Sequence, residues 1–284
     1  MGRISNFGDL PQQYSTLEHA GIVIVPVPYD GTSTWLKGAD KGPAAIIEAS
    51  GNMELYDIET DSEVYKYGIF TDEPVETDLS PKDLVRKVEE RILGFIDKDK
   101  FIVTVGGEHS VSVGAAGAHI ERYKNVTVLQ LDAHSDLRDR YEGSKYNHAC
   151  VMARIRELCP IVQVGIRSMD VSEKQFLDKK HVFFAEDIYN RTDWMKDVVS
   201  NLSEKVYITI DLDVFDPSIM PSTGTPEPGG LLWYDVLSLL KMVFTSRDVV
   251  GFDVVELCPN DINKAPDFLT AKLIYKLLSY RFRD

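Results

Sequence analysis

Cysteine, positive charge and long apolar segments are all scarce in this sequence. Its 284 residues include three cysteines, an odd number without a close pairing pattern: Cys150, Cys159 and Cys258. A chain of this length buries enough surface to fold without disulfides, so we expect free thiols and a reducing, cytoplasmic location. No apolar segment approaches the ~20 residues that span a membrane, and the first residues contain no apolar stretch typical of a secretory signal.

Basic residues are outnumbered by acidic ones. The chain has 31 Lys and Arg residues and 45 Asp and Glu residues, which gives a formal net charge of −14. An acidic surface repels nucleic acids and anionic lipids and attracts cations weakly, so we expect neither a nucleic acid nor a membrane as a partner. The sequence also lacks repeats, low-complexity tracts and Pro/Gly/Ser-rich linkers. We therefore expect a single domain over residues 1–284.

Short β-rich apolar segments alternate with amphipathic ones along the chain. Several of the apolar segments, such as Phe101–Val105, are apolar on both faces, as is typical of a parallel sheet covered on both sides. The pattern predicts strands at Gly21–Val27, Phe101–Val105, Val126–Leu131, Ile161–Val164, Val182–Phe184, Val206–Ile210 and Val249–Val255.

The amphipathic segments predict helices between these strands. Pro81–Ile96 follows Ser80, a preferred N-cap residue, and its apolar side chains recur at helical spacing. Leu231–Phe244 and Thr270–Leu278 have the same pattern. Alternating strands and helices predict an α/β fold of three α/β/α layers with a mainly parallel central sheet. In such folds ligands bind beyond the carboxyl ends of the strands.

Acidic and imidazole side chains gather where the predicted strands end. Six of them form a set of two imidazoles and four carboxylates without a thiolate: His109, Asp132, His134, Asp136, Asp211 and Asp213. Extended backbone alternates side chains between two faces, so positions 132, 134 and 136 share one face, as do 211 and 213. This donor set suits manganese, and the missing thiolate argues against structural zinc. Six ligands exceed the need of one open catalytic ion, so we expect two ions about 3.5–4 Å apart.

Each motif alone has an ordinary alternative. His109 by itself is more often a loop histidine, and the Asp211–Asp213 pair by itself is more often solvated or caps a helix. Together, four acids at one surface would repel one another strongly unless cations lay between them. We therefore interpret the three motifs jointly as a metal site.

With these motifs the chain resembles the ureohydrolases, the superfamily of arginases and agmatinases. The resemblance extends from Pro26 to the C-terminal helix and rests on four motifs: Gly106–Ser110 (GGEHS), Asp132–Asp136 (DAHSD), Asp211–Pro217 (DLDVFDP) and Gly224–Gly230 (GTPEPGG). It implies an arginase-like fold and two manganese ions per chain. One ion would be bound by His109, Asp132, Asp136 and Asp211. The other would be bound by His134, Asp132, Asp211 and Asp213.

The resemblance also implies roles in the cleavage of a guanidinium group to urea. Glu256 matches the carboxylate that holds the guanidinium group, and His148 matches the histidine that passes a proton to the leaving amine. With Asp136, also a metal ligand, they make up the expected catalytic set. Thr225 matches a threonine of the substrate pocket. Family members are usually trimers or hexamers, so we expect a homo-oligomer. The remaining histidines, at positions 19, 119 and 181, are expected to be ordinary surface or core residues.

The loop after Asp136 is expected to contact the far end of the substrate. Arginases have an asparagine where this chain has Arg138, and the loop resembles that of agmatinases, so we expect agmatine, cleaved to putrescine and urea. Asp139 and Glu142 suit a cationic end. Arg138 and Arg140 do not, unless they point away or pair with those acids. Arginine, guanidinobutyrate and aminopropylagmatine stay alternative substrates. An alternative function is that of a metal-binding relative without catalytic activity. The Gly-Asn-His block of binuclear phosphoesterases is absent.

Overall fold

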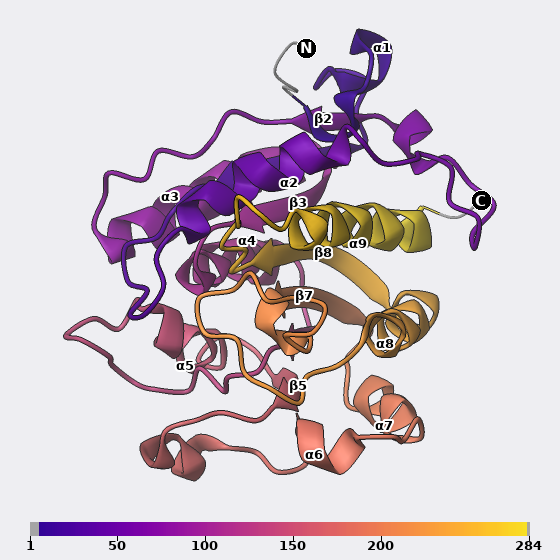
Figure 1. The fold of residues 1–284 in the computed structure, drawn as a ribbon. Coiled ribbons are helices and arrows are strands. Elements are labelled where there is room, and N and C mark those ends of the chain that lie inside the picture. Colours follow the sequence, from indigo (N-terminus) through magenta and orange to yellow (C-terminus); the bar gives the residue numbers. More distant parts are fainter. Residues whose placement is uncertain (1–5, 283–284) are drawn as a thin grey trace.

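The computed structural model describes residues 6–282 and builds them around one eight-stranded sheet (Figure 1). The strands are β1 (Ile22–Val27), β2 (Ile69–Thr71), β3 (Phe101–Gly106), β4 (Val126–Leu131), β5 (Ile161–Ile166), β6 (Val182–Phe184), β7 (Lys205–Asp211) and β8 (Asp248–Val255). Their order in the sheet is β2-β1-β3-β8-β7-β4-β5-β6, and every pairing among them is parallel. The predicted parallel sheet is therefore confirmed.

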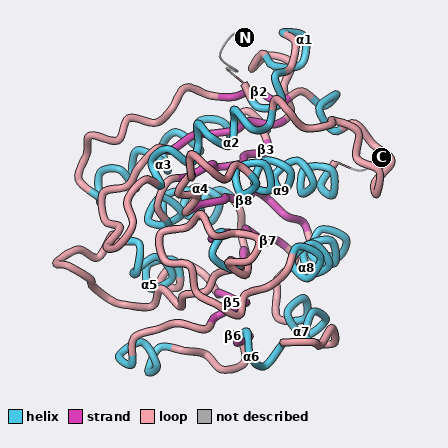
Figure 2. Tube along the Cα trace, in the orientation of Figure 1, coloured by secondary structure: helices cyan, strands magenta, loops and turns pink. Residues whose placement is uncertain are grey.

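Helices cover both faces of the sheet (Figure 2). The α-helices are α1 (Gln12–Ser15), α2 (Gly42–Ser50), α3 (Pro81–Ile96), α4 (Ser112–Arg122), α5 (Val151–Ile155), α6 (Ala185–Ile188), α7 (Trp194–Ser200), α8 (Trp233–Ser246) and α9 (Ala265–Arg281). Two apolar cores result. One lies between the sheet and α2, α7, α8 and α9, and the other between the sheet and α3, α4 and α5. The three predicted layers are thus confirmed.

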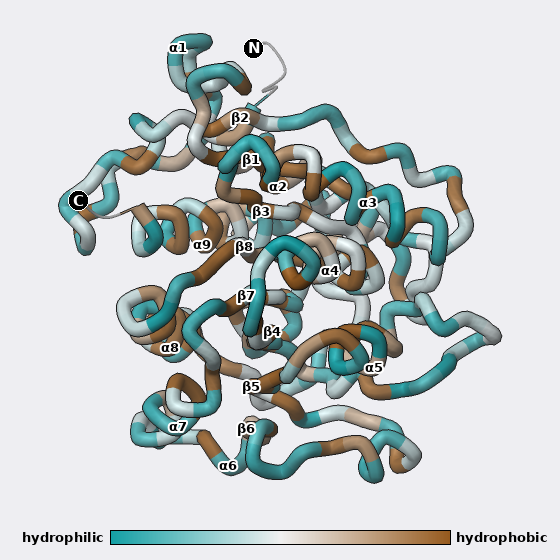
Figure 3. The backbone as a smooth tube through the Cα atoms, turned by 180° about the vertical axis from the view of Figure 1, so that it is seen from behind, coloured by the Kyte–Doolittle hydropathy of each residue, from teal (hydrophilic) through white to brown (hydrophobic). Residues whose placement is uncertain are grey.

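Side-chain alternation along the strands explains why there are two cores. In β1, Ile22 and Ile24 pack into the first core, whereas Val23 and Val25 pack into the second. All six residues of this strand are buried, which is why the sequence reads as continuously apolar rather than alternating. In Figure 3 strands such as β1 and β8 are coloured largely as hydrophobic.

The predicted strands and helices agree with the structure apart from their ends, but strand β2 and several helices, among them α2, α4 and α7, were not predicted. Ser80 caps α3 by accepting a hydrogen bond from the Asp83 amide at 3.2 Å. The predicted helix at Thr270–Leu278 is the centre of the longer α9, which begins near Pro266. Strand β2 has three residues, like the correctly predicted β6, and was missed. No helix within residues 6–282 is long and apolar enough to cross a membrane, and the three cysteines form no disulfide.

A buried ion cluster attaches the loop after α2 to α9. The Lys276 ammonium lies 2.9 Å from both carboxylate oxygens of Asp57 and 2.6 Å from Glu59, and the Lys276 side chain is 10% exposed. Burial opposes ionisation of both acids, but the Lys276 contacts hold the pKa of Asp57 below its usual value, and Lys241 and Lys276 together lower that of Glu59 to about 2. Both carboxylates therefore stabilise the fold above pH ~4, and each contribution is lost as the pH falls through the lowered pKa of that group, which is about 2 for Glu59.

Lys276→Met is expected to lower the free energy of unfolding by about 3 kcal/mol at pH 7, because it leaves the Asp57 carboxylate buried without a cation. Urea denaturation followed by circular dichroism measures this loss. The difference in free energy of unfolding between the variant and the wild type should decrease between pH 4 and pH 2, as the two carboxylates become protonated. Lys196→Met, on the exposed face of α7, is the control and should leave stability unchanged. An equal loss in both variants would contradict the role of the cluster.

Candidate active site

Four neighbouring strands bring the predicted site residues to one edge of the sheet. Strands β3, β8, β7 and β4 are adjacent in that order, and their carboxyl ends lead into His109, Glu256, Asp211 and Asp132 respectively. The chain order of these strands does not reveal their adjacency. A parallel sheet nevertheless places all carboxyl ends on the same side, so the prediction needed only the direction of each strand.

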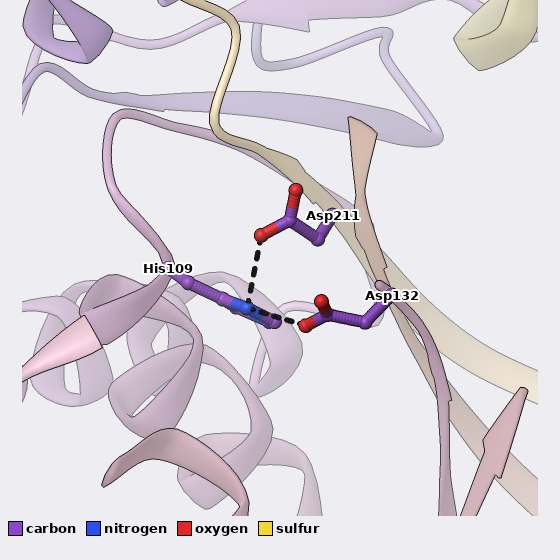
Figure 4. A group of neighbouring side chains, drawn as sticks. All are labelled: His109, Asp132 and Asp211. Atoms are coloured by element: carbon purple, nitrogen blue, oxygen red, sulfur yellow. Dashed lines mark ion pairs between the residues drawn. The ribbon is translucent and has the colours of Figure 1, made fainter. Parts of the chain in front are cut away.

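The six predicted ligands lie together. His109 Nδ1 is 3.1 Å from carboxylate oxygens of both Asp132 and Asp136, and 3.3 Å from Asp211. Figure 4 shows the imidazole of His109 directed between Asp132 and Asp211. His134 Nδ1 lies 2.9 Å from Asp213 and 3.6 Å from Asp132. Two groups of candidate ligands result, and Asp132 belongs to both: His109, Asp132 and Asp211, and Asp132, His134 and Asp213.

The hydrogen bonds of His109 Nε2 show which ring nitrogen of this histidine carries the proton. His109 Nε2 lies 3.0 Å from the Thr209 hydroxyl, which donates its own proton to the Asp253 carboxylate at 2.6 Å. The proton of this contact must therefore come from Nε2, which leaves a lone pair on Nδ1. That lone pair faces three carboxylates and makes no hydrogen bond. A proton or a metal cation must lie between them, so the site fits a metal.

The raised pKa values of the site carboxylates also indicate that the protein alone supplies too little positive charge to balance them. Burial and the Asp132 carboxylate raise the pKa of Asp136 to about 7. Burial and the carboxylates of Asp213 and Asp132 raise the pKa of Asp211 well above its usual range. Burial and Glu108 raise the pKa of Glu256 to about 8. Carboxylates that retain protons in this way can exchange them for divalent cations.

The backbone holds several of these carboxylates in place before any ligand arrives. Asp132 accepts a hydrogen bond from the His134 amide at 2.5 Å, and Glu256 accepts one from the His109 amide at 2.7 Å. Asp136 and Glu256 have positive φ angles of 51° and 67°. Such left-handed backbone is uncommon outside glycine and concentrates at functional sites. Both residues are therefore held in unusual conformations beside the candidate ligands.

A cavity of about 320 Å³ opens over this cluster. It is lined by every member of the predicted catalytic and substrate-binding sets: Asp136, Arg138, His148, Thr225 and Glu256. Metal-site residues His134, Asp211 and Asp213 also line it. The structure thus places the predicted residues around one space large enough for a small molecule.

The comparisons with known proteins agree with this geometry. A sequence model of the arginase family matches residues 20–279. The N(1)-aminopropylagmatine ureohydrolase of Synechocystis sp. is 39% identical over 92% of this chain and 89% of its own length. The agmatinase of Pyrococcus horikoshii is 33% identical over 94% of each chain. The crystal structure of the agmatine ureohydrolase of Thermoplasma volcanium is 32% identical, with a TM-score of 0.84 over 93% of this chain and 90% of that one.

This chain belongs to the arginase family. It is therefore a hydrolase of that family, and the expected arginase-like fold is confirmed. The clustered histidines and aspartates are its candidate metal ligands.

Two segments of this arginase-family chain line the cavity without having been predicted. One is the loop after β1, at Ser33–Leu36, and the other runs from Ser168 to Glu173. The first reaches the site because the end of β3 packs against it closely: a side chain on Gly107 would approach the Tyr29 carbonyl oxygen to 2.0 Å. The glycine pair of the first motif was a signal for such an approach. Beyond Ser168, the second segment carried no pattern in the sequence.

Arg138 lies at the cavity with its charge already engaged. Its Nε is 3.3 Å from Glu173, and its guanidinium group lies 4.3 Å from the ring centroid of Tyr141. The acids of its own loop are not its partners, since Asp139 pairs instead with Arg154 at 2.8 Å. Of the two alternatives left open for Arg138, the structure does not show pairing with those acids: its acidic partners are Glu173 and, at 3.9 Å, Asp170. Arg140 donates to the Gly143 carbonyl oxygen at 2.7 Å.

The remaining histidines occupy ordinary positions, as expected. His119 is buried in the core, where its Nδ1 lies 2.8 Å from the Ala115 carbonyl oxygen and its ring contacts that of Tyr207. His19 lies near the Thr16 hydroxyl, and His181 pairs with Asp178. None of the three lines the cavity over the metal ligands.

Proposed function

We propose that this chain is a two-manganese hydrolase that cleaves the guanidinium group of agmatine, releasing urea and putrescine. The observation that carries the proposal is a cavity lined by the Glu256 carboxylate and by four of the six metal-ligand candidates, with the other two, His109 and Asp132, in contact with these four. In the arrangement proposed, one ion would be held by His109, Asp132, Asp136 and Asp211, and the other by His134, Asp132, Asp211 and Asp213. When bound, two such ions lower the pKa of a shared water molecule toward neutrality.

Glu256 is proposed to orient the guanidinium group. A guanidinium cation is planar and permanently charged, and a carboxylate can pair with it through two parallel hydrogen bonds. Glu256 lines the cavity, and its Oε1 is held by the His109 amide at 2.7 Å. The cationic substrate would favour the ionised form of this carboxylate and thereby oppose the burial that raises its pKa.

His148 is proposed to carry the proton that the leaving amine needs. An amine leaves the tetrahedral intermediate only after it has been protonated, so a group that accepts and then returns a proton speeds the step. Burial lowers the pKa of His148 to about 4. Its imidazole is therefore neutral at physiological pH and has the lone pair that a proton acceptor needs. It lines the same cavity as Glu256 and Asp136.

The cavity favours a substrate whose far end is not a carboxylate. Among the described residues that line it, Arg138 is the one side chain with a permanent positive charge, and Glu173 already pairs with it. A carboxylate bound there would lack a free cationic partner. The Asp170 carboxylate, which is 42% exposed and lies 3.9 Å from Arg138, suits an ammonium group instead.

A longer polyamine is the second candidate substrate. Two relatives, from Synechocystis sp. and Thermus thermophilus, are N(1)-aminopropylagmatine ureohydrolases and are 39% and 38% identical to this chain. Trp35 and Met169 line the cavity while 68% and 40% exposed, so they lie on its open side. Such apolar surfaces suit the methylene groups of an extended tail.

We further propose, by resemblance to the family, that the enzyme is cytoplasmic and forms homo-oligomers, either trimers or hexamers.

Urea release with added manganese tests the function across agmatine, N1-aminopropylagmatine, arginine and guanidinobutyrate. Agmatine is expected to have a kcat/KM at least ~10²-fold above arginine, because a site without partners for a polar group rejects it strongly. A higher kcat/KM for N1-aminopropylagmatine would replace agmatine by the second candidate. Arginine or guanidinobutyrate turning over as efficiently as agmatine would refute the substrate choice. No urea from any of them would refute the ureohydrolase function.

A further inference from the structure

The loop after β1 places one hydroxyl group between two residues of the site. Thr32 is 9% exposed, and its Oγ1 lies 2.5 Å from Glu108 Oε1 and 3.2 Å from His148 Nδ1. The backbone amide of His148 donates to the same oxygen at 3.0 Å. Glu108 and His148 are 76 and 116 residues from Thr32 along the chain. These contacts therefore depend on the fold and not on any local turn.

Counting protons assigns the direction of each contact. The amide of His148 can only donate, so Thr32 Oγ1 accepts there. The hydroxyl has a single proton, and the carboxylate of Glu108 at 2.5 Å is the stronger and closer acceptor. With that proton committed to Glu108, Oγ1 can only accept from the ring of His148. His148 Nδ1 must then carry the ring proton, and Nε2 carries a lone pair.

Several hydrogen bonds from Glu108 fix the position of Thr32. Its side chain is fully buried, and Oε2 accepts from the amides of Thr32 and Ser33 at 2.5 and 3.0 Å. Oε1 accepts a second hydroxyl proton from Ser110 at 2.6 Å. The carboxylate thus binds both the backbone and the side chain of Thr32, which fixes the position of Oγ1 relative to the end of β3.

We propose that Thr32 is a positioning residue that holds the imidazole of His148 with its proton on Nδ1 and its acceptor on Nε2. The inference rests on the proposed proton transfer by His148. Nε2 would take a proton from the reacting water, which gives an imidazolium protonated on both nitrogens, and would return that same proton to the leaving amine nitrogen. A ring protonated on Nε2 would instead be a donor at the start and could not accept. Which ring nitrogen carries the proton is set by the partner of the other.

The direct test observes the ring nitrogens of His148. Two-bond ¹H–¹⁵N correlation spectra of the protein loaded with diamagnetic Zn²⁺ distinguish a protonated ring nitrogen from an unprotonated one, and a His148→Gln variant assigns the signals. In the wild type we expect the proton on Nδ1. Thr32→Val, which replaces the hydroxyl by a methyl group, should shift His148 toward the Nε2-protonated form. Thr32→Ser, which keeps the hydroxyl, should retain the wild-type form.

The kinetic test uses the manganese-loaded enzyme. Thr32→Val is expected to lower kcat about tenfold to a hundredfold, by analogy with the groups that orient metal-ligating histidines, with KM changed less than threefold and metal content unchanged. Thr32→Ser should recover most of kcat. Thr127→Val removes a buried hydroxyl that contacts Ser203 near the opposite end of β4, and this control should keep both kcat and the His148 spectrum.

Three results would overturn the inference: a wild-type His148 protonated on Nε2, an unchanged His148 spectrum in Thr32→Val, or a kcat of that variant within twofold of wild type. The wild-type spectrum alone decides the first, so a poorly folding variant does not remove the test. A wild type that releases no urea but has the proton on Nδ1, with the predicted shift in Thr32→Val, would refute the proposed function and leave the positioning of His148 by Thr32 standing.

Discussion

Asp132→Asn is expected to lower urea release at least ~10⁴-fold and to reduce the metal content from two ions per chain to less than one. Asp132 is fully buried and is the residue common to both groups of candidate ligands. An amide has one oxygen acceptor and no charge, so it cannot bridge two cations or offset their charge. Bridging carboxylates hold both ions of a two-metal site, so one substitution should affect both.

Metal analysis after gel filtration and a urea assay measure this effect. Asp72→Asn is a matched control, because Asp72 is a buried aspartate that binds Arg91 through two hydrogen bonds of 2.6 and 2.5 Å outside the cavity. It should lose stability but retain two ions and a turnover within twofold of wild type. If Asp132→Asn kept two ions and near-normal turnover, the two-metal arrangement would be wrong. Full wild-type activity with a single zinc ion per chain would also contradict it.

The metal-ligand candidates could be predicted because their signals are local. Asp132, His134 and Asp136 stand at alternate positions directly after β4, and each candidate follows a strand whose direction is readable from its apolar pattern. The extended backbone predicted for them is wrong in part, because Asp136 has a left-handed φ of 51° and Asp213 lies in a 3-10 turn at Leu212–Val214. The structure brings them within hydrogen-bonding distance of one another for the reason assumed, namely the shared carboxyl edge of a parallel sheet. The roles of His148, Thr225 and Glu256 came from family resemblance, and the structure adds their placement around one cavity.

The residues that support the site could not be predicted, because their partners are distant in the sequence. Glu108 stands in a recognised motif, but nothing near it indicates that its carboxylate holds Thr32, 76 residues earlier. The sequence likewise did not indicate that the charge of Arg138 in the pocket is paired with Glu173, 35 residues later. Such contacts depend on how loops close over the sheet, which strand and helix periods do not encode.

Glu256→Gln is expected to lower kcat/KM for the guanidino substrate on the order of a thousandfold, with two metal ions still bound. Removing one charge of a buried pair costs about 2–5 kcal/mol, and 4 kcal/mol corresponds to roughly a thousandfold in rate. The glutamine oxygen can still accept from the His109 amide at the position that Glu256 Oε1 now occupies. Its amide nitrogen would then present hydrogens toward the hydrogens of the guanidinium group, so the substrate would lose both its counter-charge and its orientation.

Glu256→Asp separates charge from position in the same site. It keeps the carboxylate but retracts it by one methylene group, so its kcat/KM should lie between those of wild type and Glu256→Gln. Steady-state urea release, combined with metal analysis of each variant, distinguishes substrate binding from metal loss. Glu256→Gln with wild-type kcat/KM would remove Glu256 from substrate binding. Loss of metal in Glu256→Gln would instead assign it to holding His109, whose amide it binds and whose imidazole stands among three carboxylates.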